Sequence, residues 1–282
     1  MSFQKNNPLM SSPEVTLFSE EELDKYYGGT DSEEVQEIVT DIQSLHDELD
    51  ASKGKEYYEL MNDVGRAERM QQENYRDLMD AITHYECNPG IWTWGDDEEI
   101  QEALVDFTRA LHNYLAMAMS LRDHTYRVKD KLKKDGFDDD YQEMLRKTGL
   151  SSTAPFIYDL RNHVQHRRIP VATGRNNTSV GRNRSTQQSA EVLLDKSGLL
   201  EGDKWSDESL DFLDNLDSKF SIRSTVEEHQ ESTEEFNKWF IEELNTLYGD
   251  ESQERNEILI EIAELQENLF PGLNEEFLEE ET

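Results

Sequence analysis

The sequence lacks features that mark several common protein classes. Its single cysteine, Cys87, excludes an internal disulfide and any pair of cysteines spaced for a metal or redox site. It has no run of about 18 apolar residues. Its first residues lack the basic-then-apolar order of a secretory signal. We therefore expect a soluble, cytoplasmic protein with no membrane partner.

Basic residues are scarce. The chain has 28 Lys and Arg residues against 63 Asp and Glu residues, a formal net charge of −35. The mean field of such a protein repels nucleic acids and anionic membranes. The excess of acid is typical of solvated helix faces, and it also suits a salt-rich cytoplasm. The sequence leaves both explanations open.

Apolar residues make up only 35% of the chain, but large aromatic residues are present. The 11 Phe, 11 Tyr and 4 Trp side chains can bury a core, so we expect a folded protein. Apolar residues recur at three- and four-residue steps, which predicts an all-α helical bundle. One helix is expected to begin near Ser32, and a second to run from about Lys55 to Cys87. Further helices are expected at residues 98–134, 140–147, 152–168, 206–218, 226–248 and 252–268.

The composition predicts three regions. Residues 1–30 form an irregular arm, residues 31–270 a helical domain and residues 271–282 an acidic tail. Residues 169–195 interrupt the helical domain with a β-branched, turn-rich sequence, which predicts a small β-hairpin or a loop insertion. Gly149 should end a helix, and the sequence from Ser224 to Glu228 offers a capping box to the next long helix.

One segment departs from the acidic composition. Between Leu160 and Ala190 there are six arginines and no Asp or Glu. A positive island of this kind is expected where phosphates bind, as in RNA. Alternatively, the island is a surface loop that pairs with the protein's own acidic helices.

Inside this island, Arg161, Asn162 and His166 have the residue types needed to cleave RNA without a metal. Such cleavage needs a proton acceptor, a proton donor and a fixed cation for the phosphate. Asn162 and His166 share a helix face, whereas Arg161 lies about 140° from His166. A two-fold homodimer would bring each arginine near the other histidine. Leu160 and Val164 form an apolar stripe that such a dimer would bury.

The motif resembles that of the HEPN superfamily, helical bundles in which four to six residues separate an arginine from a following histidine, commonly beginning Arg-Asn. Here it reads Arg-Asn-His-Val-Gln-His at residues 161–166. The surroundings, about residues 100–180, also look like a group of uncharacterised bacterial and archaeal proteins. The resemblance implies a HEPN-like core at about residues 98–168, followed by the basic insertion 169–195 and C-terminal helices at 206–268. It implies a metal-independent endoribonuclease in stress response or phage defence, without a cofactor.

The resemblance also suggests roles for individual residues. Arg161, Asn162 and His166 are the expected catalytic residues. The expected substrate-binding residues are Arg167, Arg168, Arg175, His163, His124 and Asn113. A non-catalytic module that binds nucleic acid or a protein such as an antitoxin, and a structural dimer, are the alternatives. A metal site at His163, His166 and His124 lacks the spacing of a known zinc motif.

Overall fold

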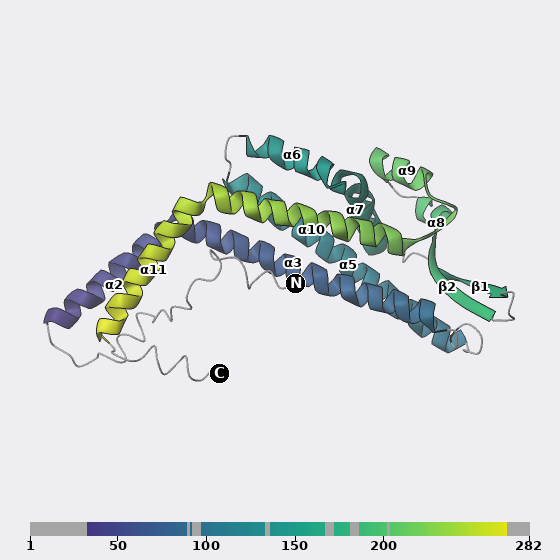
Figure 1. Cartoon of the computed structure of the whole chain (residues 1–282), viewed down its shortest axis with the longest axis horizontal. Coiled ribbons are helices and arrows are strands. Elements are labelled where there is room, and N and C mark those ends of the chain that lie inside the picture. Colours follow the sequence, from purple (N-terminus) through teal and green to yellow (C-terminus); the bar gives the residue numbers. More distant parts are fainter. Residues whose placement is uncertain are drawn as a thin grey trace. The chain divides into compact units, whose positions relative to one another are not determined.

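The computed structural model describes residues 33–88, 91, 97–132, 136–166, 172–180, 186–201 and 204–269, and most of them are α-helical (Figure 1). The expected all-α fold is confirmed. In chain order the elements are α2 (Glu33–Ala51), α3 (Lys53–Cys87), α5 (Asp97–Leu132), α6 (Phe137–Lys147), α7 (Leu150–His166), β1 (Ala172–Val180), β2 (Thr186–Asp195), α8 (Lys196–Leu200), α9 (Asp207–Asp214), β3 (Lys219–Ser221), α10 (Ile222–Leu247) and α11 (Gly249–Leu269). None of the helices described has the length and apolarity needed to span a membrane.

The chain divides into two compact units, where the sequence suggested one helical domain. The first combines residues 1–61 with residues 242–282, and the second is residues 62–241. In the first unit, α2 packs against α11 through a small core that includes Ile42 and Ile262. Gly54 lies so close to α11 that an added Cβ would stand 2.1 Å from the carbonyl oxygen of Glu251. Glycine is therefore required at this contact.

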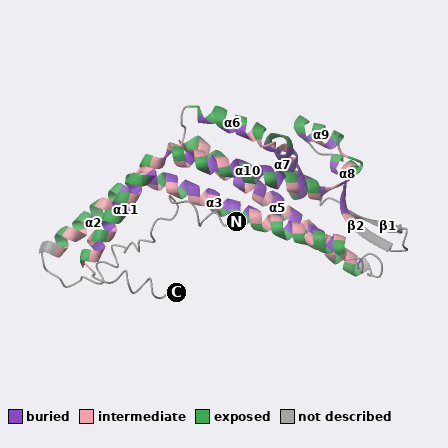
Figure 2. Cartoon of the chain, in the orientation of Figure 1, coloured by how far each residue is buried: buried purple, intermediate pink, exposed green. Residues whose placement is uncertain are grey.

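The second unit holds the larger core. Its helices alternate buried and exposed residues, as expected for amphipathic helices around a common interior (Figure 2). Tyr114 of α5, Phe156 of α7 and Val226 of α10 are fully buried there. Leu160 and Val164 belong to the same core, with exposed fractions of 0% and 9%. The hypothesis that a dimer is needed to bury these two residues is wrong, because they are already buried within a single chain.

The basic insertion contains the expected β-hairpin. β1 pairs antiparallel with β2 in a register that matches Ala172 with Leu194. A third strand, β3, adds to β2 and places Phe220 opposite Leu194, which gives the order β1-β2-β3. The sequence did not reveal β3, because three residues are too few to show an alternating pattern.

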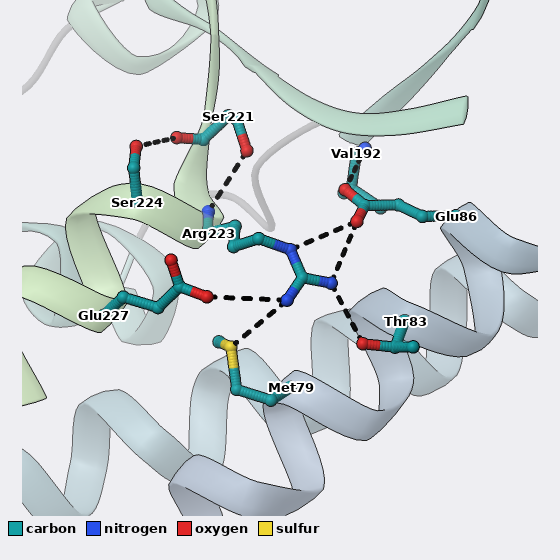
Figure 3. A network of polar contacts seen from close by, with 8 residues as sticks. All are labelled: Met79, Thr83, Glu86, Val192, Ser221, Arg223, Ser224 and Glu227. Atoms are coloured by element: carbon teal, nitrogen blue, oxygen red, sulfur yellow. Dashed lines mark hydrogen bonds and ion pairs between the residues drawn. The ribbon is translucent and has the colours of Figure 1, made fainter. Parts of the chain in front are cut away.

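A pair of charged residues, Arg223 and Glu86, joins the hairpin to the helices (Figure 3). Arg223, at the start of α10, donates from Nε and Nη2 to Glu86 Oε2 of α3 at 3.1 and 2.9 Å, and from Nη2 to Thr83 Oγ1 at 3.0 Å. The other oxygen of Glu86 accepts from the backbone N–H of Val192 in β2 at 3.5 Å. One carboxylate thus holds α3, α10 and β2 together.

The helix ends show which local predictions succeeded. The predicted stop is confirmed: α6 ends at Lys147, and Gly149 follows with a φ of 80°. The predicted capping box is wrong, because α10 begins at Ile222 and Ser224 lies inside its first turn. The chain continues from β3 straight into α10, so tertiary pairing sets the helix start.

Candidate functional site

The motif helix α7 is fixed by its own apolar face. Phe156, Ile157 and Leu160 are fully buried in the core that α7 shares with α5. At the N-terminus of the adjacent α9, the carboxylate of Asp159 accepts hydrogen bonds from the N–H and the hydroxyl of Ser206, at 2.8 and 2.7 Å. These contacts leave Arg161 at the edge of the helix pair, beside α5.

Arg161 lines an open hollow of about 350 Å³ with residues of α5. We call this hollow the cationic concavity; its lining residues are Ala116, Met119, Ser120, Asp123, His124, Arg127 and Arg161. Two residues predicted from the sequence, Arg161 and His124, are brought together here. Ser120 and Arg127 join them from the same side of α5.

Arg161 makes few contacts for a charged side chain. Its Nη1 donates to the side-chain oxygen of Asn162 at 3.1 Å, and its Nε is buried without a hydrogen-bond partner among the residues described. Within the part of the chain that the structure describes, Arg161 forms no ion pair. A buried N–H without a partner is costly, so an acceptor at this guanidinium would stabilise the site.

The other charges of the cationic concavity are partly compensated. Arg127 lies 3.5 Å from a carboxylate oxygen of Asp63 in α3. A hydrogen bond from Arg66, together with the charges of Arg66, His124 and Arg127, lowers the pKa of Asp63. Asp123 accepts two hydrogen bonds from Arg122, at 3.1 and 2.8 Å. Arg161 is thus the lining guanidinium that forms no ion pair with a described carboxylate.

These groups suit a phosphate. Guanidinium groups present planar donors that match phosphate oxygens, and an imidazole can add a further hydrogen bond or move a proton. The hydroxyl of Ser120 adds a neutral donor at the same hollow. The arrangement can hold a phosphodiester, and one described imidazole, that of His124, lies beside it.

The remaining predicted residues lie elsewhere or outside the described part. Asn113 is exposed on α5 but does not line the concavity. The ring of His163 is 4% exposed and stacks on Trp205 with centroids 5.8 Å apart, so it too lies away from the hollow. Asn162 is exposed and touches the site through its bond to Arg161. Arg175 pairs in register with Glu191 in the hairpin.

Three predicted residues cannot be placed at the site. His166 is the last residue of α7, and its side chain lies outside the described structure. Arg167 and Arg168 follow it and are outside the described residues altogether. Among the side chains that are described, no group of three or more His, Cys, Asp or Glu residues could hold a metal ion.

A second pocket, of about 180 Å³, lies on another side of α5 and was missed by the sequence argument. We call it the aromatic pocket; it is bounded by α5, α6, α7 and α10 and includes His229, whose ring is 1% exposed. Burial lowers the pKa of His229 to about 4, so the ring is neutral near pH 7. Its Nδ1 lies 2.7 Å from the hydroxyl of Tyr114, while Nε2 has no hydrogen-bond partner among the described residues.

His229 was not predicted as a site residue, because it lies in the polar sequence Glu-Glu-His-Gln-Glu-Ser at residues 227–232. Its spacing from apolar residues along the helix could have indicated that it is buried. Val226, Thr233 and Phe236 lie three, four and seven residues away, and all are buried. Glu68 of α3 is also buried, and burial raises the pKa of its carboxyl.

Comparisons with protein-family models, with curated proteins and with solved structures find no match to this chain. Fold and site therefore define the protein only as an all-α protein with a cationic concavity and a buried aromatic pocket. Its membership of the HEPN superfamily stays a prediction based on the motif at residues 161–166.

Proposed function

We propose that the chain binds RNA at the cationic concavity and cleaves it without a metal ion. The observation that carries the proposal is Arg161, which lines the hollow beside His124 without an ion pair to any described carboxylate. In a chain of net charge −35, a guanidinium in this state needs a specific explanation. A phosphodiester that accepts its hydrogen bonds supplies one.

The proposed mechanism assigns a role to each motif residue. Arg161 binds the phosphate and stabilises the charge that develops on its oxygens. His166 takes the proton from the ribose 2′-hydroxyl, which attacks the phosphorus, and returns a proton to the leaving 5′-oxygen. Asn162 orients Arg161 through the bond between their side chains. Arg167, Arg168 and Arg127 add contacts to neighbouring phosphates.

A two-fold dimer is part of the proposal. Arg161 and His166 lie about 140° apart around one helix, so partner motifs across an axis would complete each other's sites. Two chains of −35 repel each other, so the dimer should form more readily as salt rises. RNA binding should weaken over the same range, because counterions compete for the phosphates. Sedimentation and RNA binding measured across one salt series test these opposite trends.

RNA binding without turnover is the second candidate. It is favoured by the composition of the described site, in which two guanidiniums line the hollow beside one imidazole. Binding requires only the cations, whereas cleavage also depends on His166. In a non-catalytic module, replacing Arg161 would therefore still weaken RNA binding. Replacing His166 would have no effect on products, because no RNA would be cleaved.

The deciding experiment incubates purified protein with mixed RNA in EDTA. Wild type should yield products, and Arg161→Ala and His166→Ala should not. Arg146→Ala is the matched control, because Arg146 is an exposed arginine of α6 that does not line the concavity. Tight RNA binding without products would support the second candidate. Failure of wild type to bind or cleave RNA would overturn both.

A further inference from the structure

The aromatic pocket is built like a site for a small molecule. Its floor consists of buried side chains, including Ala154, His229 and Phe236, with exposed fractions of 6%, 1% and 2%. Its rim carries the more exposed Arg122 and Tyr126. The volume of about 180 Å³ is slightly larger than a cavity of about 150 Å³ that admits benzene in another protein. The space therefore fits one aromatic ring with a small substituent.

Most polar groups of this pocket are already satisfied. The hydroxyl of Thr125 donates to the carbonyl oxygen of Arg122 at 2.8 Å, and that of Thr233 to the carbonyl oxygen of His229 at 2.7 Å. His229 Nε2 and Asn237 Nδ2 are different, because both are buried and neither has a hydrogen-bond partner among the described residues. Leaving such an atom unpaired in the interior is costly. An occupant that hydrogen-bonds to Nε2 removes this cost.

The tautomer of His229 decides what Nε2 needs. If Nδ1 accepts from the Tyr114 hydroxyl 2.7 Å away, Nε2 carries the proton and donates; in the other tautomer Nε2 accepts. A hydroxyl group serves both cases, since it can donate or accept. The pocket floor has no formal charge, and the charge of Arg122 at the rim is paired with Asp123. These features favour a neutral ligand with a hydroxyl over an ion.

Aromatic side chains surround the same space. The ring of Tyr158 meets His229 edge-on with centroids 6.4 Å apart, and Tyr141 meets Phe236 edge-on at 5.0 Å. Edge-on and offset contacts of this kind stabilise a further aromatic ring. We propose that the aromatic pocket binds a neutral, phenol-class molecule, with its ring among Tyr158, Tyr141 and Phe236 and its hydroxyl on His229 Nε2. This inference does not depend on RNA cleavage at the cationic concavity.

Phenol itself is the probe. Wild-type protein labelled with ¹⁵N is titrated with phenol, benzene and benzoate and followed by NMR. Phenol should bind saturably and shift amide signals of residues that line the pocket, such as Ala154 and Thr233. It should bind about fivefold more tightly than benzene, the ratio expected for one hydrogen bond of about 1 kcal/mol. Benzoate should not bind, because its charge would be desolvated without a partner.

Three variants separate this pocket from unspecific binding. Ala154→Leu fills the space and should abolish the phenol shifts. Ala51→Leu makes the same exchange at an exposed site on α2 and should leave them unchanged. His229→Phe keeps a ring of similar size without Nε2, so it should bind benzene and lose the preference for phenol.

Three results of these titrations would contradict the proposed phenol site. Absence of saturable phenol binding to wild type would mean that water alone occupies the pocket, and the proposal would fail. Unchanged phenol binding by folded Ala154→Leu would also overturn it. If Ala154→Leu does not fold, the test rests on the ratio of the affinities for phenol and benzene, measured in wild type and in His229→Phe. Equal ratios in the two proteins would refute the role of Nε2.

Discussion

The cationic concavity and the aromatic pocket lie on different sides of the same helix, α5, and place histidines in opposite surroundings. His124 is partly exposed among Arg127, Arg161 and Asp123. His229 is buried among aromatic rings and stays neutral near pH 7, since its pKa is about 4. The comparison teaches that burial and neighbouring charge determine what a histidine can bind. We therefore propose a phosphate as the ligand of the first site and a neutral molecule as that of the second.

The largest expected effect contrasts two consecutive residues of α7, of which only Arg161 lines the concavity. Leu160 is fully buried, whereas Arg161 is partly exposed at the edge of α7. Leu160→Ala should lower the free energy of unfolding by about 2–5 kcal/mol, because it leaves a cavity in the core. Arg161→Ala should change it by less than about 1 kcal/mol. Urea unfolding of both variants measures the difference, and equal losses would mean that Arg161 is a core residue.

A pH series tests whether His229 is buried in its neutral form. His229 has a pKa of about 4 when folded, against 6.5 as the ordinary value. Between these values the unfolded chain binds more protons, so His229 should reduce stability progressively as the pH falls from 6.5 to 4, and add nothing further below 4. The full loss is about 3 kcal/mol.

His229→Phe isolates this contribution from those of the carboxyl groups. The difference in unfolding free energy between wild type and the variant should change by up to about 3 kcal/mol across this window. Parallel curves for wild type and His229→Phe would contradict a buried, neutral His229.

At the concavity, Arg161 and Arg127 differ in their pairing. Arg161→Ala should weaken RNA binding at least tenfold, about 1.4 kcal/mol, because it removes a charge-assisted hydrogen bond to a phosphate. Arg127→Ala should weaken it less, since Asp63 already offsets part of the charge of Arg127. Fluorescence anisotropy with labelled single-stranded RNA measures both. A larger loss for Arg127 would place the phosphate nearer to α3.

The smallest effect is expected at the salt bridge between the two sites. Arg122 lines the aromatic pocket and Asp123 the concavity. Their side chains have exposed fractions of 30% and 61%, so the pair is screened by solvent. Arg122→Gln should change the free energy of unfolding by less than about 1 kcal/mol, including its contact with the ring of Tyr158. Thermal unfolding checks this; a loss above 2 kcal/mol would make the pair a structural link.

The sequence predicted the long helices well, because their apolar periodicity extends over many turns. Residues 98–134 correspond to α5, Asp97–Leu132, and residues 152–168 to α7, Leu150–His166. The hairpin in 169–195 was also expected. The start of α10 was misplaced, because β3 feeds directly into it and no local signal records that pairing.

The site was predicted only in part. Arg161 and His124 were chosen separately, and the contact between α5 and α7 brings them to one hollow. The buried positions of His163 and Val164 depend on neighbours that are distant in the sequence, such as Trp205. His229 was missed for the same reason, since its surroundings come from four helices. Periodicity identifies the buried face of one helix but not the side chains that another helix places against it.

The ion pair between Arg223 and Glu86 has a consequence for local unfolding. Glu86 holds Arg223 with one oxygen and the Val192 N–H with the other. If β2 separates from α3, Glu86 loses one of its partners and the pair is opened to water. Fraying of the hairpin is therefore coupled to the first turn of α10, and hydrogen exchange at Val192 should accelerate when Arg223 is replaced by Ala. The contact of Glu86 with Val192 thus anchors the basic insertion to α3 at the base of the hairpin.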